Sequence, residues 1–598
     1  MIVEELQKLV LQATKFLKNE GFLNEIKDTL ISFEHPENPE HGDYSTNVAL
    51  VLAKGLNQNP RQLAEDIVSK LEIRNLKFLD FVKVEGPGFI NFFLKQEYLA
   101  KELQEVVKKK EKYGQGNTQK KKVMVEFTDP NPFKEFHIGH LYSNTVGESL
   151  SRLLEFGGAQ VKRVNYQGDV GLHVAKAVWG MQHKMEEESI SLEEIAKTNL
   201  SDRVKFLGQA YAAGDQAYES TDAKQDIESL NTKIFALDKE IKKLYQRGRK
   251  WSLEYFEQIY KRLGTTFDYY YFESDVGKVG EKLVQEGMRK SIFKKSQGAI
   301  IFPGEKYGLH NRVFITSQGL PTYEAKELGL APTKYKDFKY DLSLIITGSE
   351  IVDYFKVLLA ALKETNPELG EKTKHLSHGM VRFPEGKMSS RTGNVLTGEQ
   401  LIEEVKDRIG KIMESSASEI PTKEQEAAKE IIAVGAIKYS LLRIGLGRDI
   451  TFDFDKSLSV EGESGPYLQY TYARCKSILR KAKPKSSLLH SSRVFGRMRF
   501  SEEEMTLLRL LYRFPEVVRD AGEQFSPNLV CSFVFDVARA YNNFYKIHRV
   551  LSPSGGSFEG RQAPTEEQKQ FRLMLTVATA QIIKNSLHLL GIKTLERM

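Results

Sequence analysis

Cysteine is almost absent from this chain of 598 residues, which contains only Cys475 and Cys531. Because neither lies in a C-x-x-C or histidine-rich cluster, the sequence excludes a disulfide framework and a structural zinc site. The chain also lacks an apolar run long enough for a signal peptide or a membrane span, and it has no clear repeat or low-complexity tract. These absences predict a cytoplasmic protein with reduced thiols and no membrane association.

Basic residues exceed acidic residues only slightly. The 87 basic and 80 acidic residues leave a net charge of +7, which permits a polyanionic partner without requiring one. Hydrophobic residues make up 40% of the chain, which is ample for packed cores. A chain of this length indicates about three or four domains.

A strand, a loop and a helix follow one another from Val123 onward. Val123–Phe127 is a short apolar run rich in β-branched residues, which predicts a strand, and the prolines after it predict a loop. Leucine and valine then recur at helical spacing from Gly139 to Leu154, which predicts a helix. Such a helix start attracts anions, because its N–H groups are free and its dipole is positive there.

His137-Ile138-Gly139-His140 occupies this predicted helix start. Imidazoles can donate hydrogen bonds to phosphate oxygens, and the glycine between them lets a nucleotide approach the backbone. Far downstream, Phe383–Asn394 combines glycines, a lysine and hydroxyls, a composition that suits a polyphosphate whose charge changes during reaction. In this order the two segments resemble the HIGH and KMSKS signatures of class I aminoacyl-tRNA synthetases.

The resemblance implies an ATP site. Enzymes of this class join an amino-acid carboxylate to the α-phosphate of ATP and expel pyrophosphate, so His137, His140 and Lys387 would stabilise charge at phosphorus. Tyr166–Gly171 also resembles the family's G-D-W-G segment, with Val170 in place of tryptophan. The ATP-binding positions are then Phe136, His137, Gly139, His140, Gly168, Asp169, Met380, Val381, Lys387, Met388 and Ser389.

The second lysine of KMSKS is missing, because Ser390 and then Arg391 follow Ser389. Two hypotheses account for the missing charge. One assigns it to Lys134, in the loop before the first histidine, as a further catalytic residue, and the other assigns it to Arg391. Mg²⁺ normally accompanies ATP, but the sequence has no evident carboxylate set for it, so we expect no metal held by the protein alone.

Three further residues indicate which amino acid is bound. Glu126 lies inside an otherwise apolar strand, where a charge is costly unless a cation neutralises it. Tyr323 and Glu327 are four residues apart on a predicted helix, so they share one face. A guanidinium needs such acceptors in a fork arrangement. These positions resemble the arginine site of arginyl-tRNA synthetases, which implies the arginine-binding residues Glu126, Asn131, His137, Tyr323, Glu327, Glu350 and Asp353.

Two departures from that family's pattern affect the arginine site. Glu327 stands where the family usually has aspartate, and Ile351 stands at the position of a glutamine. The alternatives are an exposed edge-strand acid for Glu126 and a solvated helix acid for Glu327.

Both ends of the chain carry segments that resemble tRNA-binding domains of this family. His41–Leu50 and Val84–Leu94 resemble the N-terminal domain that contacts the elbow of the tRNA, whereas Gly465–Arg474 and Leu589–Met598 resemble the anticodon-binding domain. The resemblance implies the tRNA-binding residues Asn91, Phe93, Tyr467, Tyr470, Arg474, Tyr541, Arg549 and Met598, with Lys546 as a further phosphate contact. For Phe93 and for each tyrosine alone, packing inside the domain is the alternative.

These segments predict an α/β multidomain protein. Strands that alternate with helices favour a Rossmann-like parallel sheet in the catalytic domain. The expected parts are a small N-terminal α/β domain with a connecting helix at 1–113, a catalytic domain at 119–397, a helical connecting region at 398–465 and an all-helical anticodon-binding bundle at 466–598. A helical insertion is expected at about 181–296, where Ile227–Leu244 fits a helical hairpin better than a short coiled coil.

The resemblance implies that arginine is activated with ATP and passed to the 3′ end of its tRNA by a monomer that binds no DNA. It also implies that activation depends on tRNA. One rival is a class I synthetase for another amino acid, although a cysteine-specific enzyme would need a zinc cluster. The other is a catalytically silent RNA-binding paralogue. The intact HIGH and KMSS segments oppose it, because neither is needed to bind tRNA.

Overall fold

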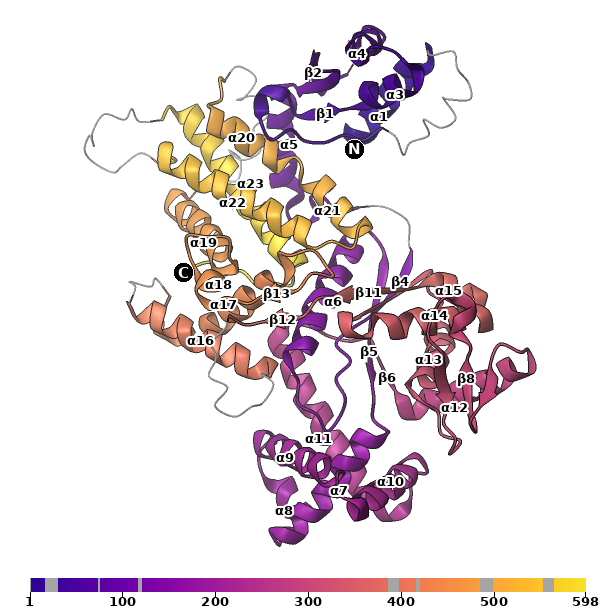
Figure 1. Cartoon of the computed structure of the whole chain (residues 1–598). Coiled ribbons are helices and arrows are strands. Elements are labelled where there is room, and N and C mark those ends of the chain that lie inside the picture. Colours follow the sequence, from indigo (N-terminus) through magenta and orange to yellow (C-terminus); the bar gives the residue numbers. More distant parts are fainter. Residues whose placement is uncertain are drawn as a thin grey trace. The chain divides into compact units, whose positions relative to one another are not determined.

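The computed structural model describes residues 2–16, 31–73, 76–116, 121–384, 397–415, 420–483, 498–551 and 564–598 (Figure 1). The chain forms two compact units. The first comprises Met1–Gly114, Cys475–Glu516 and Asp536–Ile583, and the second comprises Gln115–Arg474, Val517–Phe535 and Lys584–Met598. Four helices contribute residues to both units, namely α19 (Gly465–Ala482), α21 (Phe514–Glu523), α22 (Asn528–Ile547) and α23 (Glu566–Leu589).

A five-stranded sheet, in the order β11-β10-β4-β5-β6, forms the framework of the second unit, and every neighbouring pair is parallel. The strands are β4 (Lys122–Glu126), β5 (Gln160–Gln167), β6 (Tyr269–Phe272), β10 (Leu342–Gly348) and β11 (Thr373–His378). The chain starts at central β4, adds β5 and β6 on one side, and then adds β10 and β11 on the other. Parallel sheets bind ligands at such a reversal, which here falls at the carboxyl ends of β4 and β10. The predicted Rossmann-like parallel sheet is confirmed.

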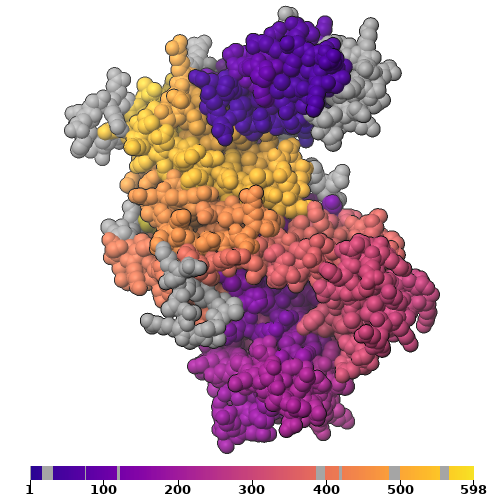
Figure 2. Space-filling view, viewed as in Figure 1, coloured from indigo at the N-terminus to yellow at the C-terminus, as the bar shows by residue number. Residues whose placement is uncertain are grey.

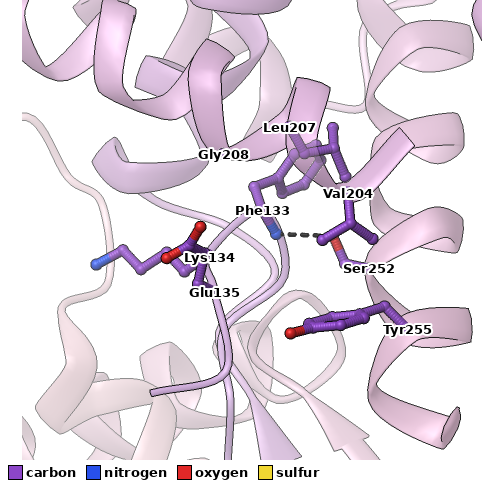
Figure 3. A pocket seen from close by; sticks show the side chains of 8 residues that line it. All are labelled: Phe133, Lys134, Glu135, Val204, Leu207, Gly208, Ser252 and Tyr255. Carbon is purple, nitrogen blue, oxygen red and sulfur yellow. Dashed lines mark hydrogen bonds between the residues drawn. The ribbon is translucent and has the colours of Figure 1, made fainter. Parts of the chain in front are cut away.

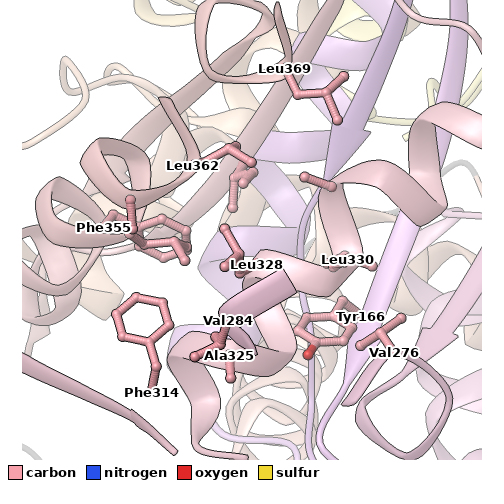
Figure 4. Close-up of a cluster of buried hydrophobic side chains, with 14 of the residues drawn as sticks. Tyr166, Val276, Val284, Phe314, Ala325, Leu328, Leu330, Phe355, Leu362 and Leu369 are labelled. Carbon is pink, nitrogen blue, oxygen red and sulfur yellow. The ribbon is translucent and has the colours of Figure 1, made fainter. Parts of the chain in front are cut away.

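Helices cover both faces of this sheet. α6 (Ile138–Phe156) packs on one face, where Gly147 leaves room for the ring of Phe127. The other face carries a hydrophobic core built with α12 (Glu273–Arg289), α13 (Tyr323–Asp337) and α14 (Val352–Thr365), shown in Figure 4. Met124 of β4 belongs to that core. Because side chains alternate along a strand, Glu126 points to the same side as Met124.

A helical insertion follows β5. It consists of α7 (Leu172–Glu187), α8 (Leu192–Lys197), α9 (Leu200–Ala217), α10 (Thr221–Phe235) and α11 (Lys239–Leu263), which form the purple lobe in Figure 2 and share one core. α10 ends at Phe235 and α11 begins at Lys239, so the segment forms two helices joined by a turn, as a helical hairpin requires. The range expected for the insertion also contains β6 and α12. These two elements belong instead to the sheet and its core.

Smaller elements complete the second unit. Three antiparallel strands form a separate sheet, and two short parallel strands pair after the catalytic core. The elements are β7 (Lys294–Ser296), β8 (Ala299–Phe302), β9 (Arg312–Ile315), α15 (Pro367–Lys372), β12 (Val381–Arg382), α16 (Gly398–Ser415), α17 (Thr422–Leu442), β13 (Ile450–Thr451) and α18 (Phe454–Leu458).

The first unit combines the N-terminal α/β elements with part of the C-terminal helices. Its elements include α1 (Ile2–Ala13), β1 (Tyr44–Thr46), α3 (Val48–Leu56), α4 (Pro60–Ser69), β2 (Leu79–Glu85), β3 (Phe89–Leu94), α5 (Gln96–Lys109) and α20 (Glu502–Leu511). Asp43, fully buried, accepts hydrogen bonds from the Leu94 backbone N–H at 2.7 Å and from Arg509 Nε at 2.9 Å. Tyr44 Oη donates to Glu516 Oε1 at 2.7 Å. These buried polar contacts join the two parts.

None of the helices in the described ranges is both long and apolar enough to cross a membrane.

Two glycines set the distance between α12 and α13. A Cβ atom at Gly280 would lie 1.7 Å from the carbonyl oxygen of Ala325, and one at Gly329 would lie 2.5 Å from that of Val276. The two helices therefore cross with their backbones in contact. Since α13 carries Tyr323 and Glu327, this crossing decides where those two side chains stand relative to the sheet.

We expect Gly280→Ala to lower the free energy of unfolding by at least about 2 kcal/mol, because neither backbone can give way to the added methyl. Gly277→Ala on the same helix is the matched control. Its Cβ would meet only flexible side-chain atoms at 3.6 Å. That change should be neutral or stabilise the helix by up to about 1 kcal/mol. Urea unfolding of both variants measures the difference, and equal midpoints would contradict the close crossing.

Candidate active site

The loop between β4 and α6 has an unusual backbone. Thr128, Asp129 and Phe133 all have positive φ, at 82°, 44° and 69°. Such conformations are costly for residues other than glycine and cluster at functional sites. Hydrogen bonds hold the loop in place. The Thr128 N–H donates to Ser143 Oγ at 2.9 Å, and Asn144 Nδ2 donates to Thr128 Oγ1 at 3.0 Å.

The two histidines of the HIGH segment cap α6. His137 Nδ1 accepts from the Gly139 N–H at 3.1 Å, and His140 Nδ1 accepts from the His137 N–H at 3.3 Å. The rings stack with centroids 3.5 Å apart. Desolvation lowers both pKa values, that of His140 well below 6.5, so both rings are neutral at neutral pH. Because each Nδ1 is an acceptor, each Nε2 carries the hydrogen and can donate to a ligand.

The end of the KMSS segment's loop is attached to this helix start. Thr397 forms an isolated antiparallel bridge with His137, and the Gly398 N–H donates to the Phe136 carbonyl at 2.7 Å. The residues of the loop itself on which predictions fell lie outside the described residues, namely Lys387, Met388, Ser389 and Arg391.

Lys134 lies at the histidine end of the β4–α6 loop. Partial burial lowers its pKa, and its charge in turn contributes to the lowered pKa values of His137 and His140. Its Nζ lies 5.2 Å from the ring centroid of Tyr211 in α9. Lys134 also lines a small cavity between the loop and the insertion (Figure 3), together with Phe133, Glu135, Val204, Leu207, Gly208, Ser252 and Tyr255.

Other residues predicted to bind ATP have mainly internal partners. The Gly168 N–H donates to Asn131 Oδ1 at 3.0 Å. Asp169 is fully buried and accepts from the backbone N–H and hydroxyl of Ser274, at 2.9 and 2.8 Å, and it pairs with Arg249. Met380, 47% exposed, uses its backbone N–H and carbonyl on Asp449 and Ile450, so its side chain remains for a ligand, while the neighbouring Val381 begins β12.

Glu126 has an internal cation. Its Oε2 lies 2.5 Å from Lys334 Nζ, and both side chains are 2% exposed. The prediction that Glu126 needs a positive partner is therefore right in its physical reasoning, but Lys334 of α13 already supplies that partner. Lys334 lies seven residues after Glu327, two helical turns along the same face, a spacing that sequence reasoning overlooked.

Glu327 is the acid without such a partner. It is 9% exposed and makes no hydrogen bond or ion pair with any residue in the described part of the chain. Burial raises its pKa well above 4.5, and the nearby Glu126 charge raises it further, although Lys334 opposes this. Glu327 also lines a small cavity with Lys334, Leu328, Ala331, Ile345, Leu358, Leu359, Leu362 and Thr373. Among the described residues, Glu126, Asp129 and Glu327 therefore share the single cation Lys334.

Tyr323 is the exposed member of the pair on α13. Half of its surface is accessible, and its hydroxyl lies 3.3 Å from His173 Nδ1. Lys326 Nζ lies 4.4 Å from its ring centroid and forms a buried ion pair with Glu273. Sequence reasoning missed His173, Lys326 and Glu273, because only the fold brings α7, α12 and α13 together.

Glu350 and Asp353 differ in their surroundings. The Glu350 charge raises the pKa of His137 against desolvation, which places Glu350 near the helix start of α6. Asp353 is 68% exposed and pairs with Lys356 at 2.8 Å, and this contact lowers its pKa. Hydrogen bonds connect Asn131 with Tyr323 through Gly168 and His173, and the Glu126 charge acts on Glu327, whereas Asp353 faces solvent.

In the first unit, two of the predicted tRNA contacts lie on β3. Asn91 is 2% exposed, accepts from Ser45 Oγ at 2.7 Å and donates to Glu85 Oε2 at 3.1 Å. Phe93 stacks on Phe81 with centroids 4.2 Å apart, and Phe81 is 46% exposed.

The predicted anticodon contacts are of two kinds. Tyr541 is fully buried and donates to Thr576 Oγ1 at 3.2 Å, so it offers an RNA neither a ring face nor a hydroxyl. One helical turn further, Tyr545 is 42% exposed. Lys546 is exposed as well, whereas Tyr467, Tyr470, Arg474, Arg549 and Met598 are partly exposed.

The fold and this site define a class I aminoacyl-tRNA synthetase. Family models match three consecutive parts of the chain: "Arginyl tRNA synthetase N terminal domain" at residues 2–94, "tRNA synthetases class I (R), catalytic domain" at 102–454, and "DALR anticodon binding domain" at 468–598. The chain belongs to the arginyl-tRNA synthetase family.

Individual relatives agree over nearly the full length. Arginine–tRNA ligase of Treponema denticola is 33% identical over 580 residues, which cover 95% of each chain. The enzyme of that name from Clostridium perfringens is 31% identical over 94% of this chain and 95% of its own. Among solved structures, Thermus thermophilus arginyl-tRNA synthetase superposes with a TM-score of 0.79 over all of both chains at 23% identity, which shows the shared fold.

The raised pKa of Glu327 predicts how stability depends on pH. The folded state holds this proton more tightly than the unfolded state, so ionisation above about pH 4.5 favours unfolding and stability falls as pH rises through the folded pKa. Glu327→Gln should therefore stabilise the ligand-free protein at about pH 8, with the gain shrinking toward about pH 4.5. Urea unfolding at several pH values tests this. Glu281→Gln, an exposed change on α12, should have no such effect, and a pH-independent gain would contradict the assignment.

Proposed function

We propose that the protein activates L-arginine with ATP and then transfers arginine to the 3′ end of its cognate tRNA. The observation that carries this proposal is Glu327, a buried carboxyl that lines a cavity and lacks a cation of its own. A guanidinium would supply the missing charge, and its planar fork of N–H donors can serve Glu327 and the Tyr323 hydroxyl together. Glu126, already neutralised by Lys334, would act mainly by holding that lysine and shaping the pocket.

The ATP phosphates would bind at the start of α6. The Nε2–H groups of His137 and His140, with the helix dipole, would stabilise the negative charge that develops at the α-phosphorus. Lys387 and Ser389 would bind the departing pyrophosphate, and the bridge between Thr397 and His137 supports this role for their loop.

Mg²⁺ would enter as part of the ATP complex. In the ranges that the structure describes, no group of three or more His, Cys, Asp or Glu side chains is placed to hold a metal ion. The metal would supply charge neutralisation on the phosphates, while the protein's own residues position them.

The tRNA would contact surfaces in each unit. In the first unit, the exposed ring of Phe81 extends the Phe93 platform and could stack on an unpaired base, with Asn91 bracing the strand beneath. Tyr545, together with Lys546 and Arg549, would take the role expected of Tyr541. In the second unit, Tyr467, Tyr470, Arg474 and Met598 remain the candidates for the anticodon loop. The place of action would be the cytoplasm, where the buried, free Cys475 and Cys531 stay reduced.

The decisive experiment is ATP–pyrophosphate exchange with each of the twenty amino acids, with and without arginine tRNA. We expect exchange with arginine alone, and only when tRNA is present. Exchange with arginine in the absence of tRNA would agree with the proposed arginine pocket but refute the tRNA dependence. Exchange with another amino acid would refute the pocket, and no exchange at all would favour the silent RNA-binding paralogue.

Two acids of the predicted arginine site, Glu327 and Asp353, should differ in their effect on arginine exchange when each is replaced by alanine. Glu327→Ala removes a buried charge partner, which typically costs 2 kcal/mol or more, so kcat/KM for arginine should fall by roughly 30-fold or more. Asp353→Ala, its matched control, removes an exposed acid already paired with Lys356 and should change kcat/KM by less than about twofold. Equal losses would mean that Glu327 does not face the ligand.

A comparison of two variants can show which residue supplies the charge of the missing lysine of the KMSS segment. Lys134→Ala should lower the activation rate by about tenfold or more, corresponding to about 1.4 kcal/mol, because its charge acts on both histidines. Arg391→Ala should then have a smaller effect, and single-turnover formation of the adenylate measures both. The reverse order would assign the charge to Arg391, and two small effects would refute both hypotheses.

A further inference from the structure

His173, in the first turn of α7, links the segment after β5 to Tyr323 of α13. Its Nε2 lies 2.8 Å from the Gly168 carbonyl oxygen, and its Nδ1 lies 3.3 Å from the Tyr323 hydroxyl. The histidine is 7% exposed, whereas Tyr323 is 50% exposed. A buried group therefore holds the polar tip of a side chain whose surface is open to a ligand.

The hydrogens in this chain of contacts can be assigned from donors and acceptors alone. A carbonyl oxygen can only accept, so His173 Nε2 must carry a hydrogen. In a neutral imidazole the other nitrogen is then an acceptor, and the Tyr323 hydroxyl must donate to it. Burial lowers the pKa of His173 to about 4, so the ring is neutral at neutral pH. The Tyr323 hydroxyl therefore donates its only hydrogen to His173 and has none left to donate to a ligand.

We propose that His173 is a positioning residue that makes the Tyr323 hydroxyl a pure acceptor toward the bound amino-acid side chain. This inference rests on the proposed function. An arginine guanidinium has only N–H donors and satisfies such an acceptor. Citrulline has nearly the same shape, but it carries a carbonyl oxygen where arginine has a nitrogen. Where that oxygen faces Tyr323 it meets only lone pairs, so the hydrogen bond from Tyr323 to His173 selects against citrulline.

The surroundings of Tyr323 leave the hydroxyl few other options. Lys326 Nζ lies over the ring rather than at the hydroxyl, 4.4 Å from the centroid, and Glu273 holds it there as an ion pair. Gly168 is also held in place, because its N–H donates to Asn131 Oδ1 at 3.0 Å. Asn131, Gly168, His173 and Tyr323 thus form one continuous series of hydrogen bonds.

The test compares His173→Leu with His173→Gln in tRNA-dependent exchange. Leucine removes both contacts, so the KM for arginine should rise about tenfold, discrimination against citrulline should fall by a similar factor, and the KM for ATP should stay within about twofold. Glutamine offers one donor and one acceptor, so it should restore most of the loss. His183→Leu is the matched control, because it makes the same change at an exposed position of α7.

A double-mutant cycle with Tyr323→Phe decides whether His173 acts through the hydroxyl. In the phenylalanine background, His173→Leu should add less than about twofold. Full additivity, or an equal rise in the KM values for arginine and ATP, would overturn the proposal and leave His173 a packing residue. Thermal unfolding of each variant identifies a folding failure. If the unmodified protein does not use arginine, the proposed function itself fails, whereas arginine exchange untouched by His173→Leu refutes this inference alone.

Discussion

The site depends on an imbalance of buried charge. The Glu126 charge raises the pKa values of both Asp129 and Glu327, and among the described residues only Lys334 lies with these three acids as a cation. Burial of an unpaired carboxylate is costly in a protein of marginal stability. The proposed cationic ligand would relieve this cost, so the same buried charge that destabilises the ligand-free protein would provide selectivity for the ligand.

The helix α13 transmits this constraint to the rest of the second unit. It carries Tyr323, Lys326, Glu327 and Lys334, and it therefore contributes both the acid that lacks a partner and the cations that satisfy the others. Backbone contact with α12 at Gly280 and Gly329 leaves it little freedom to shift. A rigid carrier suits a pocket that must distinguish ligands of almost identical shape, because a movable acid could adapt to the wrong one.

The nucleotide side follows a different principle. Here the groups that would face the proposed nucleotide are backbone N–H groups, a helix dipole and two neutral imidazoles, all oriented by short local contacts. The histidines are held by capping bonds within four residues, and the strained loop before them is held by α6 itself. Donors arranged in this way need little reorganisation when charge develops on phosphate.

The sequence by itself determined what depends on local pattern. The β4–α6 segment, the placement of Tyr323 and Glu327 on one helical face and the parallel sheet all follow from periodicity and turn chemistry, and the family motifs predicted an ATP site at the start of α6. Only the tertiary structure decided which buried charges meet. Contacts between distant segments decide that Lys334 neutralises Glu126, that His173 reaches Tyr323 and that β6 belongs to the sheet rather than to the insertion. They also decide that Tyr541 faces inward while Tyr545 faces outward. Sequence spacing does not encode such contacts, because long-range packing, rather than local propensity, brings those groups together.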